Sequence, residues 1–77
     1  MMVEFDRIRS DPKIMRGVPC IIGTRVTVAS IVGMLASGHS RERILAGFPD
    51  LQAGDVDEAL RYAAWRLTEQ EVAATSE

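Results

Sequence analysis

This chain has almost none of the residues that usually reinforce a small protein. Its 77 residues include a single cysteine, Cys20, and a single histidine, His39. One cysteine cannot form a disulfide within the chain, and these two residues offer no ligand spacing for a structural metal ion. A chain of this length makes one domain at most and buries only roughly 60% of its unfolded surface. The sequence therefore predicts no cofactor, and it favours a partner chain as a source of stability.

The sequence also has no basic excess and no long uninterrupted apolar segment. Its 9 Lys and Arg residues are outnumbered by 11 Asp and Glu residues, which gives a formal net charge of −2. A dedicated nucleic-acid binder usually has a clear positive excess. The opening residues, MMVEFDRIRS, contain no apolar segment of the signal-peptide kind, and Pro19 and Arg25 interrupt the apolar middle of the chain. We therefore expect a cytoplasmic protein that makes no use of a membrane.

Catalytic patterns are missing as well. Cys20 and His39 are too isolated to suggest a catalytic pair, and no Ser-His-Asp triad can be argued from the residues present. The tripeptide GTR at 23–25 lacks the further Gly, Lys and Ser or Thr of a phosphate-binding loop. The sequence therefore predicts a binding protein and no enzyme.

What the sequence does contain is a nearly uncharged apolar segment. Hydrophobic residues make up 47% of the chain, and Arg25 is the only charged residue from Gly17 to Ser40. A buried guanidinium needs fixed acceptors. We therefore favour a structural role for Arg25, in which an ion pair with Asp11 or Asp6 pins the β segment onto the helices; the alternative is contact with a phosphate or with an acid of a partner. The residues assigned to this structural pin or partner contact are Arg25, Asp11, Gly23 and Thr24.

Residue periodicity predicts two short strands followed by three helices. Residues 3–10 and 20–22 have the composition of short strands. Thr27 is expected to cap the first helix and Ser40 a second, short one. A third helix is predicted to begin at Asp55 or the residues just before it and to end at Gln70. The predicted organisation is one domain over 1–70, with a β segment at 3–26 and helices over 27–70, and a flexible tail at 71–77.

The first predicted helix has no charged face. Such a helix is usually covered on all sides, whereas a small domain covers only one stripe of each helix. We therefore expect a homodimer formed through this helix. Two aromatic residues of the last helix lie off its inner stripe, and each is equally consistent with a lid on the core and with an anchor for a partner. The candidate interface residues are Ile31, Met34, Leu35, Tyr62 and Trp65.

Several arginines on the second and third predicted helices are candidates for DNA contact. In a helix-turn-helix motif the second helix of the pair reads the major groove through its first residues. Here that helix begins with Asp55, Asp57 and Glu58, which repel phosphates. We favour a solvated face of paired charges, and we expect weak DNA binding by the free protein. The candidates for DNA contact are Arg41, Arg43 and Arg61.

A series of short motifs occurs in a fixed order between residues 11 and 64. Together they resemble the bacterial domain-of-unknown-function 433 family, and the match covers about two-thirds of the chain in order and without gaps. The motifs are Asp11-Pro12, Gly17 with Pro19, Gly23-Thr24-Arg25 with Val28, Ala36-Ser37-Gly38, Phe48-Pro49, Asp55-Val56, Ala59-Leu60 and Tyr62-Ala63.

This resemblance implies a mainly α fold, in which a short β segment or hairpin precedes a three-helix, homeodomain-like helix-turn-helix bundle. It also implies the antitoxin of a toxin–antitoxin pair, which neutralises a PIN-like ribonuclease toxin and often binds its operator DNA. The chain departs from the family pattern at Val18 and Ile22, where basic residues are common, and at Thr27, where Pro is common. The loss of two positive charges argues against phosphate binding by this loop.

Our interpretation is an antitoxin whose β segment and tail cover the active site of a toxin. Two alternatives remain open at this point. The first is a stand-alone helix-turn-helix regulator that binds DNA. The second is a homodimeric structural interaction module that binds no nucleic acid.

Overall fold

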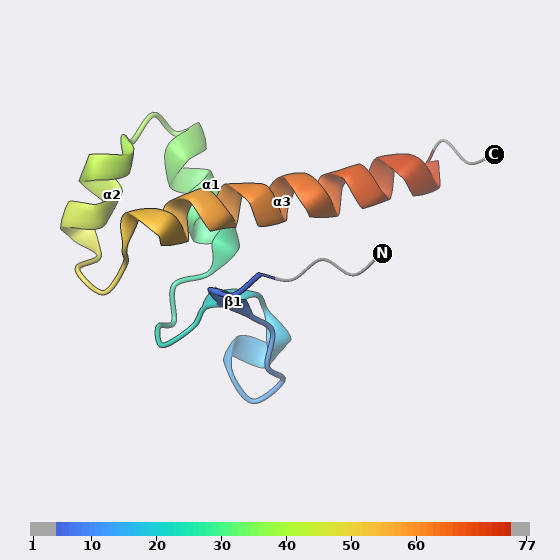
Figure 1. Cartoon of the computed structure of the whole chain (residues 1–77), viewed down its shortest axis with the longest axis horizontal. Helices are drawn as coiled ribbons and strands as arrows, with labels where there is room; N and C mark the ends of the chain where they lie inside the picture. Colours follow the sequence, from blue (N-terminus) through green and yellow to red (C-terminus); the bar gives the residue numbers. More distant parts are fainter. Residues whose placement is uncertain (1–4, 75–77) are drawn as a thin grey trace.

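The protein folds into a small antiparallel hairpin followed by three helices (Figure 1). The computed structural model describes residues 5–74, with side chains described in that range except at Met15 and at 69–74. This arrangement confirms the predicted mainly α fold with a β hairpin in front. The elements in chain order are β1 (Ile8–Arg9), the 3-10 turn η1 (Met15–Gly17), β2 (Cys20–Ile21), α1 (Val28–Ala36), α2 (Arg41–Gly47) and α3 (Ala53–Ala74).

The two strands pair with each other within one chain. Ile8 lies opposite Ile21, and Arg9 lies opposite Cys20. Each strand has two residues, fewer than the ranges 3–10 and 20–22 predicted, and residues 3 and 4 lie outside the described part. The short hairpin therefore serves to position the loops at its ends.

Side-chain caps fix where α1 and α2 begin. The backbone N–H of Ser30 donates to Thr27 Oγ1 over 3.0 Å, and the N–H of Arg43 donates to Ser40 Oγ over 3.1 Å. These bonds satisfy donors that the first turn of a helix leaves free. Both predicted caps are therefore confirmed.

The longest helix, α3, begins just before Asp55, as the sequence predicts, and ends later than predicted. Its first residue is Ala53, because Asp55 Oδ2 accepts the backbone N–H of Gln52 over 2.8 Å and so caps the helix from its third position. The helix continues to Ala74, beyond the predicted end at residue 70. Residues 71–74 of the predicted tail are thus helical, and residues 75–77 lie outside the described part.

The core forms where α1, α2 and the first half of α3 meet. In Figure 1, α1 crosses the first half of α3, and the second half of α3 extends beyond this crossing. Ile31 and Val56 are 0% exposed, and Ile44 is 2% exposed. Ile31 was predicted to lie at a dimer interface, and that prediction is wrong, because its place on the inner stripe of α1 buries it completely within one chain. Met34 and Leu35 pack partly against the same core.

Candidate functional site

An arginine does join the hairpin to the helices, but it is Arg7 and not Arg25. Arg7 Nη1 lies 3.1 Å from Asp55 Oδ1 and 3.1 Å from Gln52 Oε1. The backbone N–H of Arg7 also donates to Glu58 Oε2 over 2.7 Å. Asp55 and Glu58 are both buried, so their carboxylates need such partners. The acids at the start of α3 therefore hold the hairpin in place.

Gly54 makes room for this contact. A Cβ atom at Gly54 would lie 2.8 Å from the guanidinium carbon of Arg7. The guanidinium therefore lies directly against the backbone of the first turn of α3. Because the side chains involved are about 50 residues apart in the sequence, no local pattern points to this contact.

Arg25, by contrast, is exposed. Within the described residues, no hydrogen bond or ion pair links it to Asp11 or Asp6, so the predicted buried pin is wrong. The chain turns sharply before Arg25, and the apolar side chain of Val26 packs against the core instead. Asp11 Oδ1 accepts the backbone N–H of Lys13 over 2.9 Å, which closes a local turn. Contact of Arg25 with a partner stays a prediction.

The turn that carries Arg25 has a defined conformation. Gly23 has a φ of +84°, in the left-handed region that favours glycine. Thr24 Oγ1 donates to the carbonyl oxygen of Ile21 over 2.9 Å and accepts the backbone N–H of Val26 over 3.0 Å. Gly23 and Thr24 therefore shape the turn that presents Arg25 to solvent.

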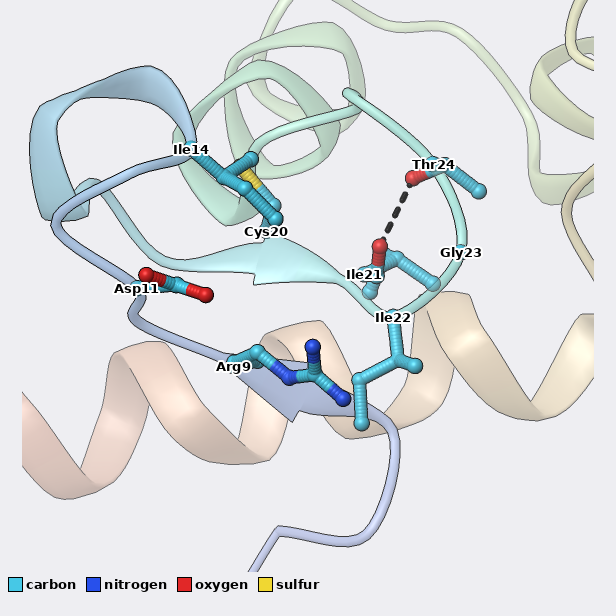
Figure 2. Close-up of a pocket in the computed structure, with 8 residues that line it drawn as sticks. All are labelled: Arg9, Asp11, Ile14, Cys20, Ile21, Ile22, Gly23 and Thr24. Carbon is cyan, nitrogen blue, oxygen red and sulfur yellow. Dashed lines mark hydrogen bonds between the residues drawn. The ribbon is translucent and has the colours of Figure 1, made fainter.

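Arg9 and Arg25 line one hollow of about 490 Å³, together with Ile14, Gly23, Thr24 and Asp50. A much smaller pocket of about 20 Å³ adjoins it and shares Arg9. Figure 2 shows this smaller pocket, in which the Arg9 guanidinium extends toward Ile22 and away from Asp11. Of the four residues assigned to the predicted pin, Gly23, Thr24 and Arg25 line the larger hollow and Asp11 does not. Sequence reasoning missed Arg9, whose position depends on the strand register.

Two of the three arginines proposed to contact DNA have acidic partners within the chain. Arg41 forms an ion pair with Asp57, and Arg61 Nη2 lies 3.4 Å from Glu58 Oε1. Arg43 is exposed. DNA contact by these residues stays a prediction, but paired charges weaken the attraction of Arg41 and Arg61 for phosphate.

A second concave surface lies between α1 and α3. We call it the α1–α3 groove; its volume is about 440 Å³, and apolar side chains make up nearly all of its lining. It includes the outer face of α1, which carries no charge. Its lining residues are Val18, Pro19, Val28, Ala29, Val32, Gly33, Tyr62, Ala63, Arg66 and Leu67.

One aromatic side chain, Tyr62, lines this groove and contacts two further aromatic rings. Tyr62 lies 5.1 Å from Phe5 and 5.7 Å from Trp65, measured between ring centroids, and Phe5 and Trp65 are 5.7 Å apart. Offset and edge-on contacts at these distances are favourable. The Arg66 guanidinium carbon lies 5.9 Å from the Trp65 ring centroid. Trp65 therefore covers Phe5 on one side of α3, whereas Tyr62 also faces the groove.

The remaining candidates for chemistry are few. In the described part of the chain, no three or more His, Cys, Asp or Glu side chains are grouped so that they could hold a metal ion. The buried thiol of Cys20 donates to the carbonyl oxygen of Val18, with an S···O distance of 3.2 Å. None of the helices of residues 5–74 combines the length and the apolar character needed to span a membrane.

Comparison with known proteins agrees with the fold. The model of a family described as "Protein of unknown function (DUF433)" matches residues 8–63. A Sinorhizobium fredii protein named "Uncharacterized protein y4eO" is 41% identical over 56 residues, which is 73% of this chain but only 25% of that relative. A crystal structure of a DUF433 member from Anabaena variabilis matches with a TM-score of 0.75 at 27% identity, covering 88% of this chain and 69% of that chain. This chain belongs to the DUF433 family.

Proposed function

We propose that this chain is a small, cytoplasmic, non-catalytic binding protein that acts as the antitoxin of a PIN-like ribonuclease. The observation that supports the proposal is the α1–α3 groove, an apolar surface left open to solvent on a chain of 77 residues. Apolar surface contributes roughly 25 cal/mol per Å² when it is removed from water. Covering the groove therefore stabilises a complex with a partner, and this chain does not have to unfold or rearrange to expose the groove.

The groove suits a helix of a partner. Small residues, Ala29 and Gly33 on α1 and Ala63 on α3, line it and let another backbone approach closely. A Cβ atom at Gly33 would meet no other atom within 4 Å, so the groove has free space above this residue. An amphipathic helix laid into an apolar groove is a common mode of peptide recognition. Arg66 at the border adds a positive charge that an acidic residue of the partner can meet.

DNA binding as the main function has less support. Arg41 of α2 forms an ion pair with Asp57, and Arg61 of α3 forms one with Glu58. A protein that binds DNA gains affinity mainly by neutralising phosphates with free Lys and Arg. The helix-turn-helix regulator thus remains the weaker alternative, with operator binding a secondary property of the antitoxin.

The homodimeric module is the second alternative, and it uses the same groove. The uncharged outer face of α1 supports it, since Ala29, Val32 and Gly33 would face a second copy. Sedimentation at micromolar concentration separates the two occupants. Twice the 8.5 kDa chain mass in the absence of any toxin, with no binding of toxin, would favour the dimeric module.

The direct test is a calorimetric titration with a PIN-like ribonuclease encoded next to this chain, together with an assay of its ribonuclease activity. Gly33→Gln places a polar side chain in the groove without touching the core, and we expect it to weaken binding by about tenfold or more. Ala36→Gln, on an exposed position of the same helix outside the groove, serves as the matched control and should bind as the unchanged protein does. No binding by the unchanged protein, or equal binding by Gly33→Gln, would contradict the proposal.

A further inference from the structure

The hairpin end of the molecule is basic, although the whole chain has a negative net charge. The hairpin segment, residues 5–27, has five basic and two acidic residues and so a formal charge of +3, whereas the whole chain has −2. Its charged residues are Asp6, Arg7, Arg9, Asp11, Lys13, Arg16 and Arg25.

Most of these positive charges have no acidic partner among the residues that the structure describes. Arg7 is engaged by Asp55. Arg9, Lys13, Arg16 and Arg25 are exposed, and their side chains form no hydrogen bond or ion pair with any described residue. Arginine is the side chain best suited to paired contacts with a carboxylate. The hairpin end therefore presents several free donors to an external anion.

Exposed apolar side chains lie among these charges. Ile14 and Ile22 are 36% and 43% exposed, and both belong to the hairpin segment. A nucleic-acid backbone gains little from such side chains, whereas the centre of a protein interface is rich in apolar contacts and in Arg. The mixture of Arg with aliphatic residues therefore fits a protein surface better than it fits a polyanion.

The hollow between Arg9 and Arg25 is the most defined part of this surface. Arg9 extends from β1 toward Ile22 and the turn beyond it (Figure 2). The hydrogen bonds of Thr24 hold that turn, so little order has to be gained on binding. Asp50 also lines the hollow, and a continuous chain of phosphates would meet its negative charge. A carboxylate meets the same repulsion at Asp50, so we expect it to bind where it faces Arg9 or Arg25 and lies away from Asp50.

We propose that the hollow between Arg9 and Arg25 binds carboxylate side chains in an acidic segment of a protein partner. This site lies on the hairpin and is distinct from the α1–α3 groove. The proposal therefore does not depend on which partner occupies the groove. The flanking Ile14 and Ile22 add apolar contacts beside the ion pairs. The ligand is thus an acidic protein segment with interspersed apolar residues.

The test uses the full chain, labelled with ¹⁵N, and poly-L-glutamate as the probe at low salt. We expect the backbone amide signals of Gly23 and Thr24 and the Nε–H signals of Arg9 and Arg25 to shift on titration. The double variant Arg9→Gln, Arg25→Gln should bind roughly tenfold more weakly or worse, because it loses two charge-assisted contacts. The matched control is Arg41→Gln, Arg43→Gln, which removes the same charge from α2 and should keep the affinity of the unchanged protein.

Three results would overturn the proposal. Equal loss of affinity in both double variants would show that overall charge, and not the hollow, attracts the probe. The absence of any shift at Gly23 and Thr24 would show that the hollow takes no carboxylate. Tighter binding of a duplex DNA of about 20 base pairs than of poly-L-glutamate, lost in the Arg9 and Arg25 variant, would make the hairpin end a nucleic-acid surface.

Discussion

The helical part of the molecule and its hairpin end differ in how many of their charged side chains form ion pairs within the chain. In the helical part, Asp57 is paired with Arg41, Glu58 with Arg61 and Asp55 with Arg7 of the hairpin. On the hairpin end, the remaining basic side chains have no such partners among the described residues. Charges paired within the chain contribute to the fold, whereas charges left open on one surface are available to a partner. This contrast distinguishes the charges that stabilise the fold from those that a partner of the hairpin can meet.

The two regions also differ in what they bury. The helices supply Ile31, Ile44 and Val56 to the centre of the core, and the hairpin supplies Ile21 and Cys20. These two strand residues and Arg7 attach the hairpin to the helices, together with Val26 and Phe5. Stability should therefore respond strongly to changes in the helical core and weakly to changes on the outer side of the hairpin.

The largest effect is expected from a cavity in the helical core. Ile31→Ala should lower the free energy of unfolding by about 2–5 kcal/mol, because Ile31 is 0% exposed and truncation leaves a cavity. Chemical denaturation followed by circular dichroism measures the change. Ile14→Ala is the control on the hairpin end, where 36% exposure limits the expected loss to about 0.5 kcal/mol. Similar losses for the two variants would break the contrast between the regions.

The next effect concerns the junction of the two regions. Asp55→Ala removes the cap at Gln52 and the ion pair with Arg7, and we expect a loss of about 1–3 kcal/mol in unfolding free energy. Asp57→Ala is the neighbouring control. It breaks only an exposed pair with Arg41, which should cost about 0.2–1 kcal/mol. If Asp57→Ala costs as much as Asp55→Ala, the buried junction does not hold the hairpin.

Local features of this fold could be predicted from the sequence, because their causes are local. Thr27 and Ser40 cap helices through side-chain bonds to residues three positions later, and both were identified correctly. The order of hairpin and helices was also correct. The apolar character of α1 was visible as well, but Ile31 was assigned to a partner because the extent of burial within one chain is not a local property.

The attachment of the hairpin could not be predicted, because it joins residues far apart. Arg7 and Asp55 are 48 positions apart, and nothing in either segment specifies the other. Arg25 was taken to be buried because its sequence neighbours are apolar. In the structure a sharp turn exposes it, and Val26 packs against the core in its place. Apolar neighbours in the sequence do not imply burial where the chain reverses direction.

A smaller, stabilising effect is expected in the α1–α3 groove. Gly33 lies in the interior of α1, and a Cβ atom there would meet no atom within 4 Å. Gly33→Ala should therefore raise the free energy of unfolding by about 0.5–1 kcal/mol through helix propensity alone. Thermal unfolding measures it. A loss of stability would mean that α1 needs the flexibility or the close approach that Gly33 provides.

The smallest effect on stability is expected at Arg25. Its exposed side chain has no bond to a described residue, so Arg25→Gln should change the free energy of unfolding by less than about 0.5 kcal/mol. Arg7→Gln is the informative comparison, because it removes the contacts with Asp55 and Gln52 and should cost about 1–3 kcal/mol. Denaturation of both variants under the same conditions gives the difference. A loss of several kcal/mol for Arg25→Gln would restore the structural pin that the sequence suggested, whereas an unchanged stability keeps Arg25 free to meet an acidic partner.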